Sequence, residues 1–68
     1  MNTMLRIRTT VFRVSQHEMA RIAGVSQATI SKWEAGLQVP LSASLKHIRS
    51  EAIRRAIPWD DRWFWEEV

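Results

Sequence analysis

The sequence contains no cysteine and no tyrosine, and only two glycines and two prolines among its 68 residues. Without cysteine, the chain has no disulfide, no thiolate ligand for zinc and no cysteine nucleophile. It also lacks an apolar run near the roughly 20 residues that span a bilayer. Arg6 and Arg8 occupy the place where a signal peptide would need its apolar core. We therefore expect a soluble intracellular protein.

Residue patterns that support catalysis are missing as well. The sequence has no glycine-rich phosphate-binding loop and no metal-ligand spacing, and its two histidines, His17 and His47, are isolated from each other. We expect neither an enzyme nor a bound cofactor or metal ion.

Charge is distributed unevenly along a chain whose formal net charge is +3. Residues 1–58 carry nine of the ten Lys and Arg residues, whereas residues 59–68 carry one Arg against four acidic residues. A small basic domain suits a polyanionic partner such as nucleic acid. We expect one binding domain over residues 1–58 and an aromatic, acidic tail over residues 59–68.

The first segment is compatible with two structures. Apolar residues share a helical face at Met4, Ile7, Val11 and Val14. The same stretch alternates apolar and polar residues between positions 5 and 11, which is the period of a strand. A strand here would indicate a ribbon-helix-helix protein, whose strands enter the major groove of DNA.

The following segments have helix signals at both ends. Ser15 and Glu18 form a capping box that predicts the start of one helix, and Gly24 suits its left-handed end. Ser26 is a suitable N-cap for a second helix over residues 27–35, which Gly36 ends.

A further helix is predicted from Ser42 to Ile57 and is stopped by Pro58. Its expected buried face consists of apolar residues at helical spacing: Leu41, Leu45, Ile48, Ala52, Ile53 and Ile57. A short turn in the tail would complete an all-α fold, a compact bundle of four to five helices.

Two short helices across a tight glycine turn form a helix-turn-helix, which constrains three positions. The fifth must be small, the ninth must tolerate a positive φ, and the fifteenth must be an aliphatic wedge. In a unit over residues 16–35 these positions hold Ala20, Gly24 and Ile30. The remaining inward positions are also apolar, at Met19, Ala23, Val25 and Trp33.

The segment SQHEMARIAGVSQATISKWEAG, Ser15 to Gly36, resembles the Cro-like phage-repressor helix-turn-helix domains, also called the xenobiotic-response-element type. The resemblance implies a lambda-repressor-like bundle with a helical first segment. It also implies sequence-specific binding of double-stranded DNA, usually by a homodimer on an inverted repeat, and a cytoplasmic regulator of prokaryotic or phage origin. The small size of the chain favours a repressor over an activator.

The outward residues of helix 27–35 are candidates for contact with base edges in the major groove. Gln27 can pair with adenine, the Ala28 methyl can lie on a thymine methyl, and Lys32 can reach guanine or a phosphate. Ser31 completes this set as an adaptable donor and acceptor. Expected phosphate contacts flank it, at Gln16, His17, Thr29, Arg13 and Arg21.

Trp33 and Glu34 are assigned structural roles. Trp33 occupies an inward position of the unit, so we expect it in the core. Glu34 is expected to pair with Arg8 or Arg6 and thereby hold the first segment against helix 27–35.

The tail gathers more aromatic surface than a chain of this size readily buries. We expect a homodimer interface there, formed by Trp59, Trp63, Phe64 and Trp65. The alternatives are packing within the chain and contact with another protein. If the tail contacts another protein, the chain would be an antitoxin-type module whose tail binds a small toxin and whose DNA binding serves autoregulation.

Overall fold

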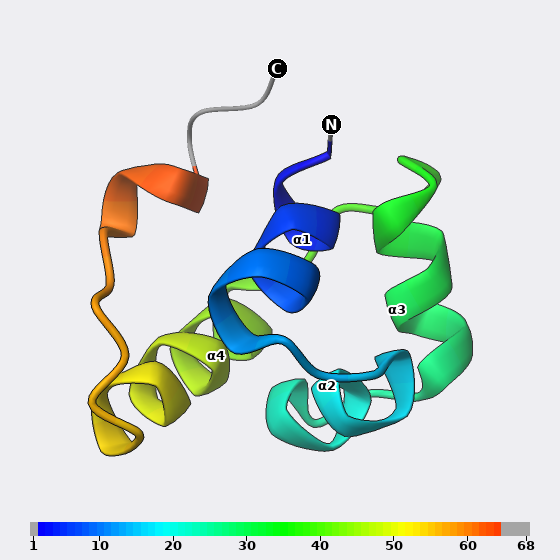
Figure 1. Ribbon diagram of the computed structural model, residues 1–68. Helices are drawn as coiled ribbons and strands as arrows, with labels where there is room; N and C mark the ends of the chain where they lie inside the picture. Colours follow the sequence, from blue (N-terminus) through cyan, green and yellow to red (C-terminus); the bar gives the residue numbers. More distant parts are fainter. Residues whose placement is uncertain (1, 65–68) are drawn as a thin grey trace.

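The computed structural model describes residues 2–64, and within them every regular element is helical. In chain order the elements are α1 (Thr3–Arg6), the π-helical segment η1 (Ile7–Phe12), α2 (Gln16–Ala23), α3 (Gln27–Glu34), α4 (Ser42–Arg54) and the short 3-10 helix η2 (Asp61–Phe64). The all-α prediction is confirmed (Figure 1). The ribbon-helix-helix alternative is wrong, because no strand forms anywhere in residues 2–64.

The first segment is one continuous helix made of α1 and η1. Asn2 caps it: its Oδ1 accepts hydrogen bonds from the backbone N–H groups of Met4, at 2.8 Å, and Leu5, at 3.3 Å. The segment is helical rather than extended because the helix buries Met4 and Ile7 in the core. The helix ends at Arg13, which has a left-handed φ of 57°.

The helix-turn-helix is formed by α2 and α3 with the caps that the sequence predicts. The hydroxyl of Ser15 accepts from the N–H of Glu18 at 3.1 Å, and that of Ser26 accepts from the N–H of Thr29 at 3.2 Å. Gly24 has a φ of 75°, and a Cβ there would lie 3.2 Å from Nδ1 of His47. Glycine suits this turn because of its positive φ, and any side chain there would also displace the imidazole of His47 slightly.

The core lies where α1 and η1, the helix-turn-helix and α4 meet (Figure 1). Its buried apolar side chains come from all five of these elements: Met4, Ile7, Phe12, Met19, Ala20, Ala23, Ile30, Trp33, Ile48 and Ala52. Trp33 is only 2% exposed, so it lies in the core as expected. The small residue at Ala20 and the wedge at Ile30 are both buried, which lets α2 and α3 pack closely.

The fourth helix differs from its prediction in length and in its buried face. It ends at Arg54 rather than at Ile57, and Leu41 and Ile53 are 72% and 57% exposed instead of buried. The buried stripe follows Ser44, Ile48 and Ala52, which are spaced by four residues. Ile53 lies about 100° around the helix from Ala52, which turns it toward solvent.

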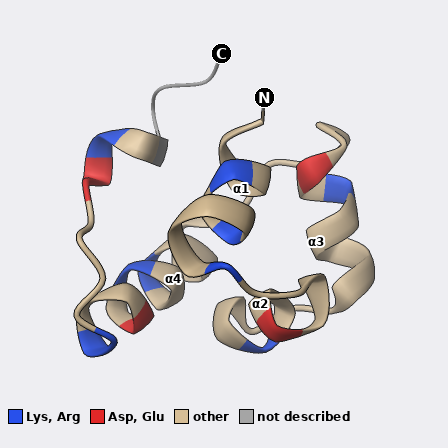
Figure 2. Cartoon of the chain, in the orientation of Figure 1, with Lys and Arg blue, Asp and Glu red and all other residues tan. Residues whose placement is uncertain are grey.

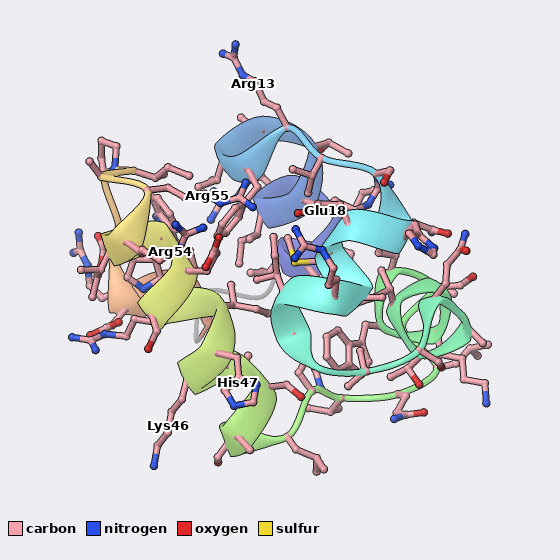
Figure 3. All side chains as sticks on the ribbon, turned by 90° about the horizontal axis from the view of Figure 1, so that it is seen from below. Arg13, Glu18, Lys46, His47, Arg54 and Arg55 are labelled. Carbon is pink, nitrogen blue, oxygen red and sulfur yellow. The ribbon has the colours of Figure 1, made fainter. Side chains whose placement is uncertain are left out.

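Ion pairs fasten α4 to α2 beside this stripe. Arg55 donates to Glu51 at 2.6 Å and to Glu18 of α2 at 3.2 Å (Figure 3). Hydrogen bonds from Arg54 and then Arg55 lower the pKa of Glu51 to about 2. The Glu18 carboxylate also pairs with Arg21, so only the serine half of the predicted capping box is supported by a hydrogen bond.

A shielded ion pair joins η1 to α3. Arg8 donates two hydrogen bonds to the carboxylate of Glu34, at 2.5 and 3.0 Å, and a third to the backbone oxygen of Val14 at 3.1 Å. Of the two predicted partners of Glu34, the structure selects Arg8. Arg6 instead lies over the ring of Trp63, 5.6 Å from its centroid.

The tail folds back on its own domain as far as the structure describes it. The ring of Trp59 meets Phe12 edge-on at 6.4 Å and Trp63 at 5.1 Å. Asp61 fixes this arrangement, because its Oδ1 accepts from the indole of Trp59 at 2.9 Å and from Arg49 of α4 at 3.0 Å.

The predicted division of the chain between residues 58 and 59 stays a prediction. Trp65 and the side chain of Phe64, which belong to the predicted dimer interface, lie outside the part of the chain that the structure describes. Within the described part, none of the helices has the length and apolar character needed to cross a membrane.

Left-handed residues end the helices, at Arg13, Gly24, Gly36 and Ala56. Ala56 has a φ of 59°, a conformation in which the side chain of an L-residue is strained. We expect Ala56→Gly to raise the free energy of unfolding by about 0.5–1 kcal/mol, measured by urea denaturation. The same substitution at Ala35, whose φ is −84°, should lower it by about 0.5–1 kcal/mol. If both substitutions changed the free energy of unfolding by the same amount, Ala56 would not be strained by its left-handed conformation.

The Arg8–Glu34 pair gives a second test of the fold. The two side chains are only 17% and 9% exposed, so Glu34→Ala leaves a shielded guanidinium without its partner. We expect the free energy of unfolding to fall by roughly 2–3 kcal/mol. The matched control is Arg49→Ala, which breaks an ion pair whose side chains are 50% and 60% exposed and should cost about 0.5 kcal/mol or less.

Candidate nucleic-acid interface

The outer face of α3 is open to solvent along its whole length. Ile30 and Trp33 point inward and are 1% and 2% exposed, whereas the four predicted base-contacting residues are all exposed: Gln27, Ala28, Ser31 and Lys32. The helical period therefore places these four side chains on one face. That face combines an amide, a methyl, a hydroxyl and an ammonium group, and it contains no acidic side chain.

The first residues of α2 and α3 are in hydrogen-bond contact across the turn. The amide of Gln27 donates to Oε1 of Gln16 at 3.5 Å, and the amide of Gln16 donates to Glu34 at 3.1 Å. Glu34 is in turn held by Arg8, whose pKa is raised by its hydrogen bonds to that carboxylate. A continuous polar chain thus runs from η1 to the exposed side chain of Gln27.

This chain of contacts was only partly predicted from the sequence. The Glu34 pair was expected, but the contacts of Gln16 with Gln27 and Glu34 were missed. A signal for them exists, since both glutamines occupy the first position of their helices, α2 and α3. The side chain of Gln16 reaches both Gln27, the first residue of α3, and Glu34, its last.

The predicted phosphate-binding residues fall into two groups. Gln16 is half-buried at the start of α2, while His17 and Arg13 are exposed nearby, and Arg13 extends away from the body of the molecule (Figure 3). Thr29 and Arg21 already have partners in the chain.

The two partnered residues are held differently. The hydroxyl of Thr29 lies 3.0 Å from that of Ser26. Arg21 is paired with Glu18, and this hydrogen bond is the largest cause of the lowered pKa of Glu18. Part of the positive charge of Arg21 is thereby neutralised inside the protein.

Charge is arranged so that acidic groups do not crowd the exposed face of α3 (Figure 2). Glu34 lies at the end of α3 and is neutralised by Arg8. The acidic residues of the described tail, Asp60 and Asp61, are paired with Arg62 and Arg49. An anionic ligand can therefore approach α3 without meeting an unpaired carboxylate among the residues that the structure describes there.

Comparison with known proteins supports this geometry. A model of the helix-turn-helix family matches residues 13–46, which is half of the chain and includes α2, α3 and the start of α4. Comparisons with curated proteins and with solved structures give no match. The matched residues contain the whole unit that the sequence pattern predicts, and the chain therefore belongs to the Cro-like helix-turn-helix family of DNA-binding transcription regulators.

Proposed function

We propose that this regulator inserts α3 into the major groove of double-stranded DNA and binds an inverted repeat as a homodimer. The observation that carries the proposal is the polar chain that ends at Gln27. Because Gln16 and Glu34 already orient the Gln27 amide, less conformational freedom is lost when that amide meets a base.

Each exposed residue of α3 has a partner of suitable chemistry in the groove. The Gln27 amide forms a bidentate pair with N6 and N7 of adenine, and the Ala28 methyl lies against a thymine methyl. Lys32 reaches O6 and N7 of guanine or a phosphate, and Ser31 adapts as donor or acceptor. A good bidentate pair contributes about 1–3 kcal/mol of discrimination between bases.

Phosphate contacts fix the orientation of the domain on the duplex. Gln16, at the first turn of α2, combines a side-chain amide with free backbone N–H groups, which suits an anionic oxygen. His17 and Arg13 are exposed beside it and extend this contact. Arg21 contributes less, because a phosphate must compete with Glu18 for its guanidinium.

Repression is the regulatory outcome that this architecture supports best. Occupying an operator requires a DNA-contacting face and a dimer contact, and the described residues offer candidates for both in the outer face of α3 and the exposed loop that follows it. Two symmetric copies would place their recognition helices in successive major grooves, roughly 34 Å apart.

The dimer contact is better supported at the loop between α3 and α4 than at the tail. Trp59 and Trp63 are partly buried against their own chain. Leu37, Val39 and Leu41 are 79%, 79% and 72% exposed. The sequence LQVPL of this loop contains no charged residue, so two basic molecules can meet there without repulsion.

The base contact of Gln27 is tested by selecting binding sites from a random duplex library. We expect an inverted repeat for the wild type. Gln27→Ala should lose about 1–3 kcal/mol of discrimination at one base pair in each half-site, because the bidentate pair is gone. Affinity should also fall with salt for both proteins, since phosphate contacts release counterions.

Ser50→Ala is the control, because it removes an exposed polar side chain of α4 that lies outside both α3 and the proposed dimer loop. It should leave the selected sequence unchanged. Selection of no common site by the wild type would contradict the proposed function, and binding would then be only electrostatic.

The dimer contact is tested by sedimentation equilibrium of Leu41→Ser and Ile53→Ser. Both substitutions remove an exposed aliphatic side chain, one in the loop and one on α4. We expect Leu41→Ser to weaken dimerisation about tenfold or more, through lost apolar burial of about 1.5–3 kcal/mol, and Ile53→Ser to leave it unchanged. If Ile53→Ser weakened dimerisation more than Leu41→Ser, the dimer contact would instead involve α4 and the tail.

A further inference from the structure

Three helices of this protein end in the same way. After α2, α3 and α4, a residue with positive φ is followed by an apolar residue whose backbone N–H bonds back to a carbonyl five residues earlier. The bonded pairs are Val25 with Ala20, Leu37 with Lys32, and Ile57 with Ala52. In helix ends of this type the apolar residue usually packs against an apolar side chain in the last turn of the helix.

Leu37 differs from the other two apolar residues in its surroundings. Val25 and Ile57 are partly buried and pack against the core, and the alanines to which they bond are buried as well. Leu37 bonds back to Lys32, whose side chain is exposed, and Leu37 itself is 79% exposed. The end of α3 therefore has the geometry of the other two ends without their apolar contact.

The backbone that carries Leu37 is nevertheless held in place. Its N–H bonds to the carbonyl of Lys32 at 2.9 Å, and the N–H of Gly36 bonds to the carbonyl of Trp33 at 3.2 Å. An aliphatic side chain on a fixed backbone loses little further backbone freedom when a partner buries it. Leu37 is thus well suited to anchor a contact with another molecule.

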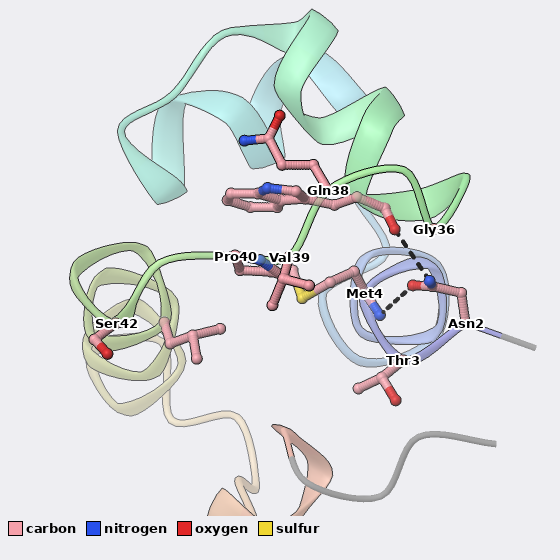
Figure 4. A pocket seen from close by; sticks show the side chains of 10 residues that line it. Asn2, Thr3, Met4, Gly36, Gln38, Val39, Pro40 and Ser42 are labelled. Carbon is pink, nitrogen blue, oxygen red and sulfur yellow. Dashed lines mark hydrogen bonds between the residues drawn. The ribbon is translucent and has the colours of Figure 1, made fainter.

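A cavity of about 450 Å³ lies beside Leu37 (Figure 4). Gly36 and Gln38, the neighbours of Leu37 in the chain, both line this cavity, whereas Leu37 does not. Among the residues that the structure describes, no charged side chain lines it. Its apolar walls come from α1, the loop after α3 and α4, and they are Met4, Val39, Pro40 and Leu45.

A second copy of this chain fits both features. In a contact with two-fold symmetry the same patch lies on both sides, so a projecting side chain must be complementary to a cavity in that same patch. Leu37 and the cavity are neighbours on one surface, which meets this condition. Residues 36–45 also contain no charged residue, so two molecules with a net charge of +3 can meet there with little repulsion.

We propose that Leu37 of each copy inserts into the cavity of the other copy, so that one dimer contains two identical contacts. The inserted side chain packs against Met4 and Leu45. The inference rests on the homodimer of the proposed function, and it names the side chain and the cavity that hold the two copies together.

Two variants each remove one half of this contact. Leu37→Ala removes the inserted side chain and keeps the cavity, whereas Ser42→Leu narrows the cavity and keeps Leu37. Each variant homodimer loses both contacts, so we expect its dissociation constant to rise about 100-fold, at roughly tenfold for each leucine side chain that is no longer buried. Sedimentation equilibrium of the full-length protein without DNA measures this change.

A mixture of the two variants provides the decisive measurement. In the mixed dimer, Leu37 of the Ser42→Leu copy enters the intact cavity of the Leu37→Ala copy. The opposite side has neither the inserted side chain nor an open cavity, so one of the two contacts is restored. The mixed dimer should therefore dissociate only about tenfold more readily than the wild type. Native mass spectrometry distinguishes it from the two homodimers.

Two matched substitutions serve as controls. Ala43→Leu adds a leucine at the next exposed position of α4, which does not line the cavity, and Ile53→Ala shortens an exposed aliphatic side chain elsewhere on that helix. Both should dimerise like the wild type. All four substituted positions are exposed, so circular dichroism should show wild-type helix content for every variant.

Three results would overturn the proposal. The first is a Leu37→Ala variant that dimerises like the wild type, and the second is a mixed dimer no tighter than the variant homodimers. In both cases the homodimer of the proposed function stands and only its contact changes. The third is a wild type that stays monomeric, which also removes the homodimer. Base reading by Gln27 is then judged separately, by whether site selection recovers a single half-site.

Discussion

The shielded ion pair between Arg8 and Glu34 joins η1 to α3, two segments that are 26 residues apart at this contact. Its side chains are shielded from solvent, so their attraction is screened less than that of a surface pair. Glu34 is also the acceptor for Gln16, and Gln16 is the acceptor for Gln27. Without this carboxylate, η1 would lose its anchor on α3, and the orientation of the exposed amide would depend on rotamer preference alone.

The angles between helices depend on how each helix ends. After α2, α3 and α4, a residue with positive φ allows a backbone N–H just beyond the helix to bond back to a carbonyl in its last turn, as Val25 does to Ala20 at 3.0 Å. Such a bond reverses the chain within a few residues, which is how two helices of eight residues each can pack against one another. Glycine occupies this position after α2 and α3, where the turns flank α3.

Local signals in the sequence were sufficient to predict the helix-turn-helix. They were not sufficient to predict the structure of the segments around it. Ser15 and Gly24 act through backbone geometry that neighbouring residues determine, so their roles follow from spacing. The first segment carried both periodicities, and contacts distant in sequence decided between them, notably the bond from Asn2 to the Trp33 carbonyl. The exposure of Ile53 was not predictable for the same reason, since the stripe of α4 that is buried depends on where α2 lies.

The outer and inner faces of α3 have different roles. Its outer face presents Gln27 and Lys32 to solvent, while its inner face is held by Ile30 and Trp33. Trp33 is a core residue, and its backbone oxygen accepts a hydrogen bond from the amide of Asn2 at 3.0 Å, so the C-terminal half of α3 is held both by packing and by the residue that caps α1.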